Sequence, residues 1–224
     1  MAQAAQDDNA ARWPNRQDSR AVPASGSLVG AHRVQASYAP PIAFSLGVGQ
    51  DFMPALGLRE GGGLPSGAVR LDWTLAPQAT GYALGLFGAG ESAGGGSGGD
   101  IVMWSSAGVA NHFPAMDYLV PADVRRQIAA NTVLAPTVSE CLLPAEVVRA
   151  APAGIVNMIG YGPEVFFAEA PTAPKWIAKV RFKSSASLIR GLGGQGDEER
   201  QGEAPRPKRH FGIGDVLRGA VPRP

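Results

Sequence analysis

The sequence predicts a mainly β protein, an antiparallel β-sandwich with two short inserted helices and flexible N- and C-terminal tails. Three observations lead to this prediction. Apolar residues recur at every second position in several short segments, Gly- and Pro-rich turns separate these segments, and only two segments inside the domain carry helical spacing. Residues 69–75 (VRLDWTL) give the clearest example, because every second side chain there is large and apolar.

The composition sets the expected domain organisation. The 224 residues include 30 glycines and 19 prolines, gathered in the tails and loops, while a hydrophobic content of 45% still allows a core of ordinary size. We expect residues 1–36 to be a disordered or extended N-terminal segment. Residues 37–190 should form the β-sandwich-like domain, and residues 191–224 a charged linker with a C-terminal docking peptide.

The spacing of apolar residues and the positions of proline and glycine predict the strands and helices. The helices are predicted at 120–131 and 143–153, where Pro121 and Pro144 suit a first helical turn because the N–H that proline lacks has no partner there. Residues 60–67 (EGGGLPSG) read as a turn. The strands are predicted at 42–48, 69–75, 81–87, 100–106, 132–143, 154–161, 165–170 and 175–185.

Residues 69–87 (VRLDWTLAPQATGYALGLF) resemble the first core hairpin of fibronectin type III domains. In that family a strand carrying a tryptophan leads through a Pro/Ala/Thr-Gly-Tyr turn into the next strand, and Trp73 and Tyr82 match those two positions. The family's second half usually carries a tyrosine near a corner, to which no residue of this chain is assigned. The resemblance implies a β-sandwich.

A glycine run at 87–100 (FGAGESAGGGSGGD) contains the pattern G-x-S-x-G around Ser92. The wording GESAGG resembles the nucleophile region of carboxylesterase-type α/β-hydrolases, which makes a serine esterase using Ser92 the alternative function. Such a serine opens a helix, yet glycines follow, and each costs a helix about 1 kcal/mol relative to alanine. The missing helix also argues against a dinucleotide-binding turn. We expect a loop that joins two strands.

The histidines support neither catalysis nor metal binding. A hydrolase triad runs in the chain order serine, acid, histidine, but only Asp100 lies between Ser92 and His112, and His210 lies in the charged tail. No histidine stands at metal-ligand spacing from another ligand. The lone Cys141 excludes an intrachain disulfide and is expected to be a small buried hydrophobe. We therefore expect no metal and no cofactor.

Two segments are candidates for binding a protein partner. In residues 179–183 (KVRFK), Lys179, Arg181 and Lys183 share one strand face, which could bind an acidic partner or could be a solvated face that blocks edge pairing. The second candidate is the C-terminal peptide after the charged linker, where apolar residues at helical spacing are typical of a tethered docking segment. Its alternative is a tail that folds back on its own domain. The candidate residues of this peptide are Phe211, Ile213, Val216 and Leu217.

These observations favour a non-enzymatic interaction or structural protein, an accessory subunit of a bacterial protein complex. Arginine far outnumbers lysine, and Ala, Gly and Pro are abundant, which is typical of GC-rich bacterial genomes. A net charge of +1 gives no field for nucleic acid, and no apolar run approaches the roughly 20 residues of a membrane span. Residues 2–13 have neither a basic nor an apolar segment, so we expect no export signal after Met1. The periplasm or envelope is favoured if Met1 is not the native start, and the cytoplasm otherwise.

Overall fold

The structure is a computed structural model that describes residues 22–23, 25–36, 39–90, 100–110, 112–114, 117–169 and 176–191. Ser92 and the whole C-terminal peptide, with Phe211, Ile213, Val216 and Leu217, lie outside these residues. The predictions made for those positions therefore stay predictions.

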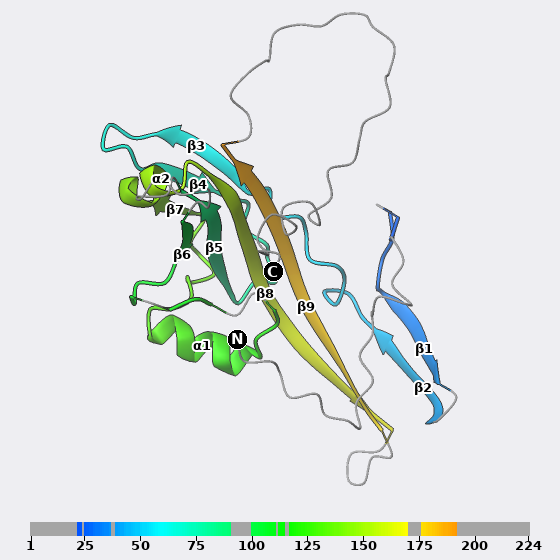
Figure 1. The fold of residues 1–224 in the computed structure, drawn as a ribbon. Coiled ribbons are helices and arrows are strands. Elements are labelled where there is room, and N and C mark those ends of the chain that lie inside the picture. Colours follow the sequence, from blue (N-terminus) through cyan, green and yellow to red (C-terminus); the bar gives the residue numbers. More distant parts are fainter. Residues whose placement is uncertain are drawn as a thin grey trace, which may run out of the picture. The chain divides into compact units, whose positions relative to one another are not determined.

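The described residues form nine strands and two helices. The elements are β1 (Gly30–Ala36), β2 (Ala39–Leu46), β3 (Arg59–Gly63), β4 (Val69–Asp72), β5 (Gly81–Ala89), β6 (Ile101–Ser105), α1 (Pro121–Ala129), β7 (Glu140–Leu143), α2 (Ala145–Ala150), β8 (Ala153–Ala168) and β9 (Ile177–Arg190). The strands make three antiparallel sheets (Figure 1), ordered β1-β2, β3-β4-β7 and β6-β5-β8-β9. The mainly β class and both helices are thus confirmed.

The three-stranded and four-stranded sheets share one hydrophobic core, which makes the domain a β-sandwich. Buried side chains of this core come from both sheets: Leu71 and Leu143 from the first, and Tyr82, Leu84, Leu86, Val156 and Met158 from the second. Tyr82, Leu84 and Leu86 stand at every second position of β5 and therefore share its inward face. Trp73 packs on Tyr82, with 5.8 Å between ring centroids, and the Ala76 N–H donates to the Tyr82 hydroxyl over 2.8 Å. These contacts fix the turn from β4 to β5.

Helix α1 covers part of the outer face of the four-stranded sheet. Val124 of α1 is fully buried, and Ile128, one turn later, packs in the same small cluster. The sheet contributes Ala83, Ile159 and Tyr161 to that cluster. Strand β5 is therefore buried on both faces where α1 lies over it, although its sequence pattern predicts a strand with one buried face.

The turn predicted for residues 60–67 is wrong in its first half. Residues 60–63 belong to β3, which pairs with β4 through a register shift between Glu60 and Gly63. The turn itself begins at Leu64, whose N–H donates to the Ala68 carbonyl over 2.9 Å. Glycines erase the side-chain alternation that identifies a strand, but their backbone can still pair at a sheet edge.

Three further strand predictions needed correction. The strand predicted at 69–75 ends at Asp72, and Leu75 is 42% exposed. Of the strand predicted at 132–143 only β7 is formed, apart from an isolated bridge between Leu134 and Tyr82. The strands predicted at 154–161 and 165–170 are one strand, β8, which continues through Pro163. A register shift between Tyr161 and Glu164 accommodates the proline, because a residue in a bulge need not donate to the ladder.

The N-terminal segment includes a strand that its composition does not predict. Strand β1 lies within residues 1–36 and pairs with β2, and the rings of His32, Phe44 and Phe167 stack in series at 5.3 and 4.9 Å. Gly88 and Ala89 of the glycine run end β5, and Ile101, the residue after the run, begins β6.

Candidate interaction surface

A line of four apolar side chains crosses the whole four-stranded sheet. Met103 on β6 pairs with Phe87 on β5, Phe87 pairs with Ile155 on β8, and Ile155 pairs with Ile189 on β9. Residues directly opposite one another in neighbouring strands point to the same face of the sheet. Because Leu86 and Val156, their chain neighbours, point into the core, these four side chains point outward. We call them the apolar row.

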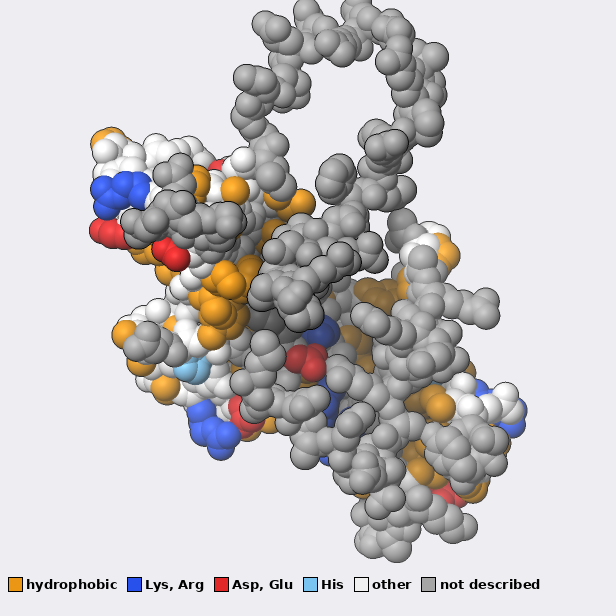
Figure 2. Space-filling model, viewed as in Figure 1, with side chains coloured by type: hydrophobic (Ala, Val, Ile, Leu, Met, Phe, Trp, Pro, Cys, Tyr) orange, Lys and Arg blue, Asp and Glu red, His pale blue; other side chains and the backbone are white. Residues whose placement is uncertain are grey.

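The apolar row is open to solvent on the part of the sheet that α1 leaves free. Its four side chains are between 41% and 60% exposed, and Ile101 beside it on β6 is 69% exposed. Figure 2 shows hydrophobic side chains gathered over the region of β5 and β6. Together with Ile101 the row forms what we call the apolar patch, with an exposed area of about 500 Å². Patches of that size on a single chain are often functional.

The next line of residues along the same face is polar. Ser105, Gly85, Asn157 and Ser187 pair across the four strands, and the Ser187 hydroxyl donates to the Asn157 side-chain oxygen over 2.8 Å. The ring of Phe113 lies over Gly85, where a Cβ would approach its Cζ to 2.5 Å. The apolar patch therefore has a defined polar border, as the rim of a protein interface does.

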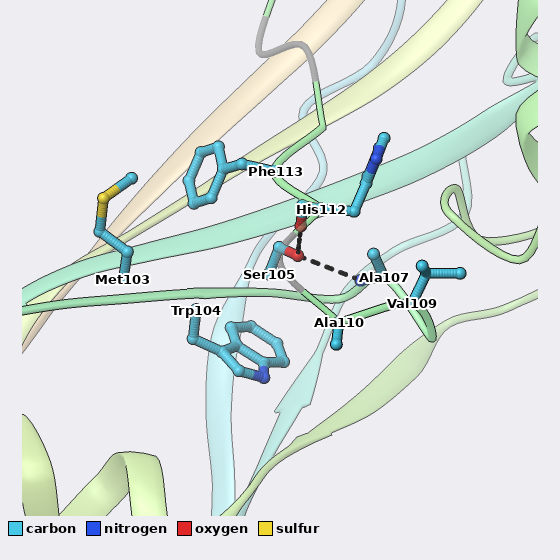
Figure 3. Close-up of a pocket in the computed structure, with 8 residues that line it drawn as sticks. All are labelled: Met103, Trp104, Ser105, Ala107, Val109, Ala110, His112 and Phe113. Atoms are coloured by element: carbon cyan, nitrogen blue, oxygen red, sulfur yellow. Dashed lines mark hydrogen bonds between the residues drawn. The ribbon is translucent and has the colours of Figure 1, made fainter.

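A cavity of about 400 Å³ adjoins the patch at Met103. Figure 3 shows its lining, with Met103 and Phe113 on one side of β6 and Trp104 on the other. The Ser105 hydroxyl donates to the backbone carbonyl of His112, and the His112 ring points away from it (Figure 3). A nucleophilic serine needs its proton accepted by a base such as a ring nitrogen, so this pair is not arranged for catalysis. The cavity is lined by Met103, Trp104, Ser105, Ala107, Val109, Ala110, His112 and Phe113.

The basic residues predicted on β9 lie together on its solvent-facing side. Lys179, Arg181 and Lys183 are exposed, while Phe182 between them is buried. The Lys179 ammonium lies 5.5 Å from the ring centre of Phe166 on the neighbouring strand. The alternation predicted for KVRFK is thus confirmed, and the binding role stays a prediction.

Two of these three cations have carboxylate partners within the domain. Arg181 pairs with Glu164 of β8, and the Lys183 ammonium lies 2.9 Å from a carboxylate oxygen of Asp117. These partners offset much of the local positive charge. The geometry therefore favours a solvated strand face over a surface that binds polyanions.

The apolar patch was not among the sites predicted from the sequence. One feature of the sequence does indicate an outward apolar side chain. In residues 84–87 (LGLF), Leu84 and Leu86 point to one face of the strand, so Phe87 must point to the other, away from the core. Whether Phe87 is exposed to solvent depends on which part of the sheet α1 covers. The local sequence of the strand cannot predict this.

The described residues contain no group of three or more His, Cys, Asp or Glu side chains that could hold a metal ion. Neither α1 nor α2 has the length and apolar character needed to cross a membrane. Comparisons with protein-family models, with curated protein sequences and with solved structures find no match to this chain.

Proposed function

We propose that this protein is a non-enzymatic interaction or structural protein, an accessory subunit of a bacterial protein complex, and that the apolar patch binds its protein partner. The exposed apolar row carries this proposal. Full burial of a large apolar side chain provides about 1.5–3 kcal/mol, and each side chain of the row, which is 41–60% exposed, lacks roughly half of that stabilisation. A partner that binds to the patch buries these side chains and gains part of this burial free energy. The polar border limits the contact to a defined area.

We also propose a fibronectin type III-like sandwich and a location in the bacterial envelope. The packing of Trp73 on Tyr82 supports the first part, as does the division of β3 to β9 into two antiparallel sheets. The envelope rests on analogy, because many domains on cell surfaces share the sandwich architecture.

Capture of partners from the native source tests the proposal. A tagged full-length chain is compared with a Phe87→Gln/Met103→Gln variant, whose changes lie on the exposed face. Each lost apolar anchor should weaken binding about tenfold, so the proteins captured by the parent chain should be depleted from the variant. Val48→Gln is the matched control, because Val48 is 98% exposed and lies outside the patch. Equal capture by all three chains would contradict the proposal.

A second experiment addresses the esterase alternative directly. A fluorophosphonate probe labels activated serines, and we expect no label on Ser92. Labelling of the parent chain that disappears in Ser92→Ala would replace the proposed function with serine hydrolysis.

A further inference from the structure

We propose that the apolar patch is the contact between two copies of this chain, which pack on each other through the same face of the four-stranded sheet. The inference rests on the proposed function, because it names the protein that binds the patch. In such a dimer the two-fold axis lies in the contact, so every feature of the surface has to fit its own copy. The shape, the charge and the area of this face all meet that requirement.

The apolar row is a ridge beside a line of small residues. Ala89 and Ala153 pair with each other across β5 and β8, two residues along from Phe87 and Ile155. Both alanines therefore point to the same outer face as the row, and their side chains end at Cβ. Gly191, just after β9, adds no side chain. A shallow trough thus borders the ridge, about 7 Å away along the strands.

Ridge and trough fit each other when two copies meet. A two-fold axis that runs parallel to the row, between ridge and trough, places the ridge of each copy in the trough of the other. Phe87 of one copy then lies on Ala89 of the second copy. The opposite side of the ridge offers no such trough, because the ring of Phe113 lies over Gly85 there. Sheets that pack face to face interdigitate their side chains in this way, about 10 Å apart.

No charged side chain of the described strands lies in this contact. The trough, the apolar row and the polar border consist of apolar and uncharged polar residues. A charge close to the axis would face its own copy and repel it. On the outer side of β9 the first cation is Lys183, six residues from Ile189 and about 20 Å along the strand. The axis places the second copy of Lys183 about 40 Å away, well beyond the screening length of about 10 Å.

The area of the contact suits a weak dimer. Each patch exposes about 500 Å², so two copies bury about 1,000 Å², and the border residues add to this. An interface of that size is at the lower limit for specific association, and we expect a Kd on the order of 10 µM. Helix α1 leaves the contact free, because it covers the sheet at Ala83 and Ile159, about 20 Å along the strands from Ala89 and Ala153.

Sedimentation velocity of the full-length chain between about 1 and 100 µM tests the inference. We expect a shift from monomer to dimer as the concentration rises. Ala89→Arg fills the trough with a long charged side chain and should raise the Kd at least tenfold. Ala168→Arg is the matched control, because it adds the same charge at an exposed position of β8 outside the patch and should leave the Kd unchanged. Urea denaturation shows whether each variant keeps its fold.

Cysteine pairing tests the register of the contact without adding a charge. On a Cys141→Ala background, Phe87→Cys and Ala89→Cys are made in separate chains. The two positions face each other across the axis, so mild oxidation of an equal mixture should give a disulfide-linked dimer with one chain of each kind. Neither variant alone should reach the same yield. A mixture that cross-links no better than the single variants would overturn the inference.

The outcomes separate this inference from the proposed function. A chain that stays monomeric at 100 µM, or a dimer that Ala89→Arg leaves intact, would overturn the inference. Capture of other proteins that still depends on Phe87 and Met103 would then leave the proposed function standing, with a different protein on the patch. A dimer that depends on Ala89, with equal capture by the parent chain and Phe87→Gln/Met103→Gln, would contradict the accessory-subunit role alone.

Discussion

Arg190 joins the two sheets of the sandwich through a single ion pair. Its side chain is buried at the end of β9, and its Nε donates to the Glu60 carboxylate on β3, in the opposite sheet. The second guanidinium nitrogen, Nη1, is buried and has no hydrogen-bond partner among the described residues. A buried guanidinium that has lost its carboxylate would keep the cost of desolvation without the compensating charge.

Removing the charge of Glu60 should therefore destabilise the protein. Glu60→Gln keeps the side-chain shape, and we expect it to lower the free energy of unfolding by about 1–2 kcal/mol, measured by urea denaturation. Glu140→Gln is the control, because Glu140 is largely exposed and lies 3.9 Å from Arg70. That change should stay within about 0.5 kcal/mol. Equal effects of both changes would show that the buried pair does not hold the sheets together.

Strands β5 and β8 approach each other closely where two glycines pair. Gly88 of β5 lies opposite Gly154 of β8. A Cβ on Gly154 would stand 2.8 Å from the Phe87 carbonyl oxygen and 2.9 Å from the Gly88 Cα. Both are backbone atoms of the paired strand, so they cannot move without disturbing the ladder.

Gly154→Ala should lower the free energy of unfolding by about 1–3 kcal/mol through this overlap. Gly62→Ala in β3 is the matched control, because nothing lies within 4 Å of its Cβ position. It should be neutral or stabilising by up to about 1 kcal/mol, since alanine restricts the unfolded chain. Thermal or urea unfolding of the two variants checks the pair, and a neutral Gly154→Ala would contradict the close packing of β5 and β8.

The elements differ in how much of them the sequence could predict. Alternation located β5, residues that favour strands located β6, and the prolines at the helix starts located α1 and α2, because these signals act within a few residues. Strand β3 was missed because a glycine-rich strand has no side-chain pattern, and β8 was divided because Pro163 looks like a break. Strand pairing depends on contacts between distant residues. The four residues of the apolar row come from four different strands. Their alignment across the sheet could therefore not be predicted from the sequence of each strand.

Burial of ionisable groups affects the molecule as a whole at alkaline pH. Burial raises the pKa of the Cys141 thiol from an ordinary value near 9 to about 12, and the neighbouring Glu140 charge adds to the effect. Burial likewise raises the pKa of Tyr118 from near 10 to about 12, with Glu164 adding to the rise and Arg181 opposing it. The pKa values of Tyr82 and Tyr161 are also raised by burial.

Stability should therefore fall as the pH rises above about 9. Each of these groups keeps its proton in the folded state at a pH where the unfolded chain releases it, so its contribution is complete below the ordinary pKa and is lost towards pH 12. Urea denaturation at pH 7 and at pH 10.5 measures the loss. Tyr118→Phe should reduce the difference between the two values, because phenylalanine cannot ionise. A free energy of unfolding that stays constant from pH 7 to 11 would contradict this expectation.

The apolar row takes one side chain from each of four strands, so it is a discontinuous epitope. Residues 87, 103, 155 and 189 meet only after the sheet has assembled, so no linear peptide of this chain reproduces the surface. Recognition of the row is then recognition of the native state. By mass action, any molecule bound there raises the melting temperature in proportion to the logarithm of its concentration over its Kd, once it is in excess. A thermal-shift screen could thus report occupancy of the row before any partner is identified.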